Sequence, residues 1–142
     1  MGFANDVGFL NKILSLVMNP SDIIKVVDYH KDNPIIIVYE PPKPTIETVK
    51  ENWKYIQTLT KGQKFHMIND ISNAPPPKAD VRHAVKDTFT EMEPYLLSSQ
   101  VYVGESYLLR IALKFIAASM GMKNFNVTKD IDEAIAKIKN EY

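Results

Sequence analysis

The sequence predicts a single α/β domain, with a mixed, mainly parallel sheet of about five strands flanked by helices and an extra N-terminal helix. Short segments rich in Ile, Val and Tyr alternate along the chain with longer segments whose apolar residues recur at helical spacing. Strands that alternate with helices pair in parallel through right-handed crossovers. The first two strands are separated only by a short polar turn, so we expect one antiparallel hairpin at the start of the sheet.

The composition fits one globular domain and excludes several functional classes. The 142 residues are 45% hydrophobic and 24% charged, with 17 basic and 17 acidic side chains. Nucleic-acid binders usually carry a basic excess, so we expect no nucleic-acid partner. Without cysteine there is no disulfide, no thiolate zinc site and no cysteine nucleophile. No stretch is apolar enough for a signal peptide or a membrane span, and we expect a cytoplasmic protein.

Residues 1–20 are predicted to form a separate amphipathic helix ahead of the main domain, which covers residues 21–142. Apolar side chains recur at helical spacing in this segment: Phe3, Val7, Leu10, Leu14 and Val17. We expect this helix to pack on its own domain or on a second subunit. Binding to a membrane surface is the alternative, weakened because the polar face lacks the Lys and Arg that such helices use.

The first half of the chain predicts a hairpin and then a helix. After a break at residues 19–21, residues 23–29 and 34–39 form the two strands of the hairpin. The second strand is apolar on both faces, which is typical of a central strand covered on two sides. A proline cluster ends that strand. Thr45 is then a plausible N-cap for a helix that stops at Gly62.

The middle of the chain predicts a strand, a proline-rich loop and a helix. Residues 64–71 read as the third strand, and three consecutive prolines follow it. Residues 78–92 then carry apolar side chains on one helical face and polar side chains on the other. Open α/β sheets place their function at this kind of strand-to-helix crossing.

The last third predicts two further strands and two helices. Residues 100–103 form the fourth strand and residues 125–127 a short fifth one. Between them, the helix over residues 106–120 is apolar almost all round, so it must be covered on more than one side. Asp130 to Glu133 reads as a capping box that opens the last helix.

Three segments resemble the STAS domain (sulphate transporter and anti-sigma-factor antagonist), in its bacterial SpoIIAA-like or STAS/SEC14-type branch. They are MINDISNA at residues 67–74, the helix over residues 110–121 that follows QVYV, and the ending FNVTKDIDEAIAKI at residues 125–138. The resemblance covers about residues 23–140. It implies a STAS-like sheet in a small cytoplasmic domain that acts by binding rather than by catalysis, without a cofactor.

Classical members of that family regulate a partner through phosphorylation of a serine, in a pattern like D-[LI]-S-x(5)-D-S. Counted from Asp70, Ile71 and Ser72, the last two positions fall on Lys78 and Ala79. The acceptor serine is therefore missing. We predict no phosphorylation switch at that place.

The carboxyl ends of the predicted strands are the expected place for a ligand or partner. Gly104 to Ser106 also presents a helix N-terminus, which can hold an anion. At Asp70, acceptance of backbone N–H bonds from residues 72–74 is favoured over contact with a ligand. The candidate ligand- or partner-binding residues are Asp70, Asn73, Lys78, Arg82, Glu105, Ser106, Tyr107 and Arg110.

No catalytic or metal-binding residue is predicted. His66 and His83 show no metal-ligand spacing, and His66 reads as a hydrogen-bonded strand histidine. His83 and Asp87 lie one helical turn apart, a spacing typical of an ordinary surface pair. No nucleophile has a base at recognisable spacing, so the chain is not expected to be an enzyme.

Apolar surface is left over on the helix at residues 107–120 and on the N-terminal helix. A two-fold dimer interface would absorb it, so a homodimer is expected. We therefore expect a binding or regulatory domain that contacts a protein partner. The alternative is a carrier or sensor of a small apolar, lipid-like ligand, which SEC14-type relatives imply, and an enzyme comes third.

Overall fold

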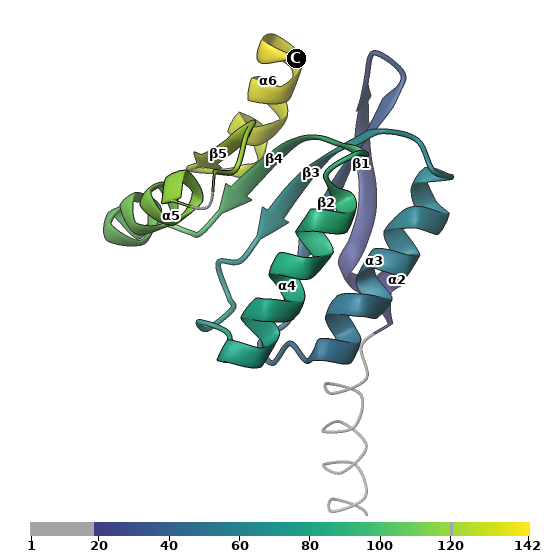
Figure 1. Ribbon diagram of the computed structural model, residues 1–142. Helices are drawn as coiled ribbons and strands as arrows, with labels where there is room; N and C mark the ends of the chain where they lie inside the picture. Colours follow the sequence, from purple (N-terminus) through teal and green to yellow (C-terminus); the bar gives the residue numbers. More distant parts are fainter. Residues whose placement is uncertain (1–18, 120) are drawn as a thin grey trace, which may run out of the picture.

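The computed structural model describes residues 19–119 and 121–142, and they form the α/β fold that the sequence predicts (Figure 1). Of the N-terminal helix predicted over residues 1–20, residues 1–18 lie outside the described residues. In chain order, the elements are α2 (Pro20–Ile23), β1 (Ile24–His30), β2 (Asn33–Tyr39), α3 (Ile46–Thr60), β3 (Phe65–Asp70), α4 (Ala79–Met92), β4 (Leu96–Tyr102), α5 (Tyr107–Ser119), β5 (Phe125–Thr128) and α6 (Ile131–Glu141).

The five strands lie in the sheet in the order in which they occur in the chain. β1 and β2 form the predicted antiparallel hairpin, and each later strand pairs in parallel with the one before it. Lys31 and Asp32 make the hairpin turn, both with positive φ (49° and 66°). Two successive left-handed residues match the twist of the strands, which is why two-residue hairpin turns favour this geometry.

Alternation along the strands divides the core between the two faces of the sheet. Toward α3 and α4, the side chains of Ile36 and Met67 pack with Trp53. On the other face, Ile35 and Ile68 pack against α6. Ala134 and Ile138 of this helix are fully buried there, and Ile131 and Ile135 are partly buried. All of Ile35 to Val38 is at most 3% exposed, which confirms that β2 is a central strand covered on both sides.

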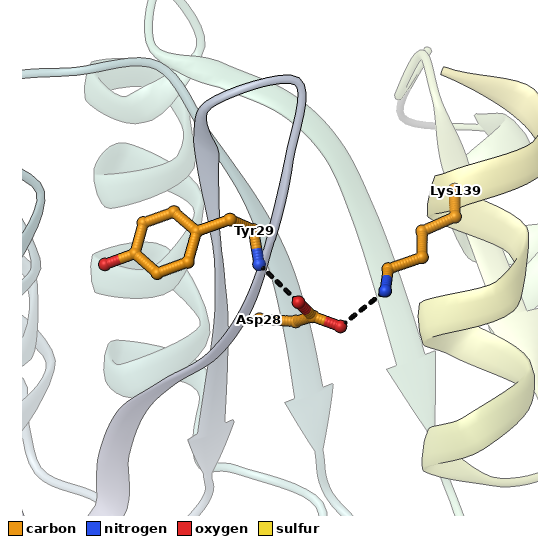
Figure 2. Close-up of polar contacts among 3 residues, drawn as sticks. All are labelled: Asp28, Tyr29 and Lys139. Atoms are coloured by element: carbon orange, nitrogen blue, oxygen red, sulfur yellow. Dashed lines mark hydrogen bonds and ion pairs between the residues drawn. The ribbon is translucent and has the colours of Figure 1, made fainter.

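An ion pair joins the C-terminal end of α6 to β1. Lys139 Nζ lies 2.6 Å from Asp28 Oδ2, and Asp28 Oδ1 accepts a hydrogen bond from the Tyr29 N–H at 2.7 Å (Figure 2). The hydrogen bond from Lys139 is the main cause that lowers the pKa of the Asp28 carboxyl. At the other end, Asp130 caps the helix by accepting from the Glu133 N–H at 2.7 Å. The Glu133 carboxylate accepts from the Lys129 N–H rather than from the Asp130 N–H, so only one of the two bonds of the predicted capping box is present.

Most boundaries agree with the sequence prediction to within one or two residues, and two differences are larger. Residues 20–23 form the short helix α2 instead of a break, because Pro20 occupies the first helical turn, where its missing N–H costs nothing. β4 begins at Leu96 rather than at residue 100, and the added residues include Ser98 and Ser99, both buried. Among the described helices, none combines the length and hydropathy needed to cross a bilayer.

Candidate functional site

Two loops meet at the carboxyl ends of β3 and β4. The Ile71 N–H donates to the Tyr102 carbonyl at 2.9 Å, so the chain leaving β3 runs beside the end of β4. Gly104 has φ +83°, and a Cβ placed on it would lie 3.6 Å from Ser72 Cβ. The positive φ favours glycine here. The loop that follows β3 therefore lies beside the loop that follows β4, at the predicted rim of the sheet.

Asp70 uses its carboxylate within its own loop. Its Oδ1 accepts from the Ser72 N–H at 3.0 Å and from the Ser72 hydroxyl at 2.5 Å. Such a bond two residues along the chain is an Asx turn, which fixes loop geometry. The N–H contact is the structural role that the sequence favoured for Asp70. Asn73, the next candidate, is exposed.

Glu40 adds a second carboxyl group to the rim. Its N–H donates to the Asp70 carbonyl at 2.9 Å, so β2 delivers it beside the end of β3. Burial raises the pKa of the Glu40 carboxyl, because removal from water disfavours the charged form. The centre of the rim thus contains two carboxyl groups: that of Asp70, which is hydrogen-bonded to its own loop, and that of Glu40, which is partly removed from water.

Lys78 and Arg82 lie on the exposed first turn of α4. Arg82 Nη1 donates to the Pro77 carbonyl at 3.1 Å, so its hydrogen bond stays within its own segment. In the described part of the chain, no polar contact links either side chain to Asp70 or to α5. No polar contact in the described structure therefore joins these two candidates to the rest of the predicted site.

The other four candidates lie at the start of α5. Ser106 Oγ accepts from the Leu109 N–H at 3.2 Å and caps the helix. Glu105 is exposed. The Arg110 guanidinium carbon lies 5.8 Å from the centroid of the Tyr107 ring, within reach of a cation–π contact.

The outer side of α5 carries the largest exposed apolar side chains on this helix. We call this surface the α5 face: Tyr107, Leu108, Leu109, Ile111 and Phe115, with exposed fractions of 66, 79, 42, 46 and 76%. The inner side of the helix is narrow, where Leu113 packs against Val101 and Val127 and Ala117 is buried. The sequence requires α5 to be covered on more than one side, and the described residues cover only one.

A hollow of about 260 Å³ lies between α5, the end of β5 and α6. Figure 1 shows these elements at the β5 edge of the sheet. The hollow combines four basic side chains with one carboxylate and three apolar or aromatic groups. Its lining residues are Tyr107, Arg110, Ile111, Lys114, Val127, Lys129, Glu133 and Lys137.

A buried histidine and serine form a pair beneath α6. His66 Nδ1 lies 2.7 Å from Ser98 Oγ, and the two residues are 2% and 1% exposed. Burial, and then the nearby His30, lower the pKa of His66 to about 4. A serine beside a base can be a nucleophile, but a substrate could not reach this buried pair. His83 lies on exposed α4, across the sheet from the His66 side chain, so the two histidines share no site.

Of the residues on the α5 face, only Tyr107 is among the binding residues predicted from the sequence. The signal for Leu108, Leu109, Ile111 and Phe115 was present, because the sequence shows a helix that is apolar all round. The sequence does not show which side of this helix packs against the sheet and which side is exposed. No protein-family model and no curated protein matches the sequence. Its function must therefore be inferred from these residues and their surroundings.

Proposed function

We propose that this chain is a non-enzymatic binding or regulatory domain of the STAS-like, SpoIIAA-like kind, which acts through protein–protein contact at the α5 face. Its first partner is a second copy of the chain, in a two-fold homodimer. Regulation does not use a phosphoacceptor serine, because the matching position is Ala79.

The exposed α5 face is the observation that carries this proposal. A large side chain has about 200 Å² of surface. Tyr107, Leu108, Ile111 and Phe115 lie within about 100° of one another around the helix, so together they present on the order of 500 Å² to one partner. Monomeric proteins seldom leave an apolar patch much larger than a few hundred Å² uncovered. This area is more than half of the roughly 800 Å² that each partner contributes to an interface of standard size.

A second copy is the occupant that suits this surface best. An isologous dimer brings the same patch of both subunits together, so an apolar face meets an equally apolar one. The five members of the face are all uncharged. The nearest cations of α5, Arg110 and Lys114, line the hollow, which Tyr107 and Ile111 border as well. Charge complementarity with a different protein therefore contributes little at the centre of the face.

The site geometry favours binding over the two alternatives. For catalysis, the rim offers Asp70 engaged with Ser72, while the His66–Ser98 pair is shut off from a substrate. For an apolar carrier, the hollow beside α5 is lined mainly by charged side chains, which suit an anion better than a lipid tail.

Light scattering coupled to size exclusion tests the dimer directly. The wild-type chain is expected to run at twice its chain mass over roughly 5–200 µM, a range that covers micromolar dissociation constants. Phe115→Glu and Leu108→Glu should each run at the single chain mass, because a buried unpaired carboxylate is too costly for the interface. Circular dichroism checks that both variants remain folded.

Tyr29→Glu is the matched control. Tyr29 is also a large, 60% exposed aromatic residue, but it lies on β1 at the opposite edge of the sheet, so the control should remain dimeric. A wild-type chain that is monomeric over the whole concentration range would refute self-association. So would a dimer that survives both α5 substitutions.

A further inference from the structure

Positive charge is concentrated in the hollow between α5 and α6. Arg110 and Lys114 come from α5, Lys129 follows β5, and Lys137 comes from α6. The whole chain has 17 basic and 17 acidic side chains, so this excess does not reflect a generally basic protein. Against the four cations, the lining holds one carboxylate, that of Glu133.

The local contacts leave most of that charge uncompensated. Glu133 Oε2 accepts from the Lys129 backbone N–H at 2.9 Å, so part of its bonding capacity is used at the start of α6. Lys137 Nζ donates to the neutral Asn126 Oδ1 at 3.3 Å. Arg110 Nε is buried without a hydrogen-bond partner. Within residues 19–119 and 121–142, none of the four cations forms an ion pair.

The size and walls of the hollow limit what can enter it. A volume of about 260 Å³ is at or below the lower end of sites for drug-sized ligands, so a peptide or a lipid tail does not fit. Guanidinium and ammonium groups that converge from three segments are typical partners of phosphate oxygens. Ile111 and Val127 supply a small apolar wall beside them.

We propose that this hollow binds a small, soluble anion that carries phosphate, held by Arg110, Lys114, Lys129 and Lys137. Arg110 supplies a buried Nε donor, Lys114 and Lys129 supply exposed ammonium groups, and Lys137 supplies a half-buried one. The hollow shares Tyr107 and Ile111 with the α5 face, but its four cations are not members of that face. Cation variants therefore test the anion site, and the Phe115 and Leu108 variants test the dimer, so the two proposals can fail separately.

Isothermal titration with inorganic phosphate and with pyrophosphate tests this site, at an ionic strength held constant with sodium chloride. We expect one saturable site per chain, with pyrophosphate bound more tightly because it offers more charge to the same cations. The Lys114→Gln/Lys129→Gln variant removes two exposed cations and should bind pyrophosphate at least about tenfold more weakly. Arg110→Gln should have a similar effect.

Lys50→Gln/Lys54→Gln is the matched control, because it removes two exposed lysines from α3. Its affinity for pyrophosphate should equal that of the wild type. The site is refuted if neither anion shows saturable binding at anion concentrations up to about 10 mM, since the dissociation constant would then be in the millimolar range or weaker. Equal weakening in the control would also refute it, since binding would then follow net charge alone. Phe115→Glu should bind pyrophosphate normally even if the dimer is lost.

Discussion

Acidification should destabilise the fold through His66. Burial beneath α6, and then the neighbouring His30, lower the pKa of His66 to about 4 from its ordinary 6.5. Because the folded-state pKa lies below the unfolded one, protonation favours the unfolded chain. The neutral imidazole is therefore compatible with full stability above about pH 6.5, and stability is lost as the pH falls from there toward 4.

The size of the loss follows from the two pKa values. A difference between 6.5 and about 4 corresponds to about 3 kcal/mol once the pH is below both values. About 2 kcal/mol of this loss falls between pH 7 and pH 5, where the unfolded histidine gains its proton and the folded one does not. That is a large share of the 5–15 kcal/mol that typically holds a domain folded.

Other groups titrate in the acid range and must be separated from His66. Burial raises the pKa of Glu40, so this carboxyl adds stability as the pH falls through that raised value toward its ordinary 4.5. The lowered pKa of Asp28 costs stability only as the pH falls below its ordinary 3.8. His66→Gln removes the titration and keeps a side chain that can hydrogen-bond with Ser98. The difference between wild type and variant therefore isolates the histidine.

Urea unfolding followed through the single tryptophan, Trp53, measures the free energy of unfolding at pH 7 and pH 5. We expect the wild type to lose about 2 kcal/mol more than His66→Gln between these values. An NMR titration of the imidazole gives the pKa directly, even if the variant folds poorly. A His66 midpoint near 6.5, or equal pH dependence of the two proteins, would show the reasoning to be wrong.

Two further substitutions test the polar interior and the rim. Gln100 is fully buried in β4, and neither its Nε2 nor its Oε1 has a partner in the described structure; Gln100→Met should therefore raise the free energy of unfolding by about 1–2 kcal/mol. A loss of stability in the same urea assay would mean that the amide is hydrogen-bonded in solution. At Gly104, whose φ is +83°, Gly104→Ala should cost about 1 kcal/mol and Gly104→Asn less, since asparagine tolerates the left-handed region. Equal costs in thermal melts would remove the backbone explanation.

The local sequence was sufficient to predict an element where all of its residues have the same surroundings, or where a signal lies within a few residues of its end. Ile35 to Val38 are apolar on both faces, and β2 is covered on both sides. Thr45 has the signature of an N-cap, and its side chain accepts from the Thr48 N–H. β4 was predicted only from residue 100 onward, because Ser98 and Ser99 before it are buried although they are polar. The partner that satisfies Ser98 is His66 on the neighbouring strand, and the intervening sequence does not reveal that pairing.

The candidate site divides in the same way. Asp70 and Ser72 are two residues apart, so their hydrogen bond follows from spacing alone. Arg110 and Lys137, by contrast, meet at one hollow only because α5 and α6 lie on either side of the β5 edge. No spacing rule predicts a contact that depends on how two helices pack around a strand. For the same reason, the prediction that Lys78 and Arg82 belong with the start of α5 rests on the sequence alone, since no polar contact in the described structure joins them.

The position of α6 in the chain has a consequence for biosynthesis. This helix buries Ile35, Ile37 and Ile68 on its face of the sheet, yet it is translated after all five strands. While the ribosome completes the chain, that aliphatic stripe stays open to solvent. Nascent chains in this condition are typical clients of chaperones, and they aggregate when synthesis stalls. Expression at lower temperature or with a co-produced chaperone should therefore improve the yield of folded protein.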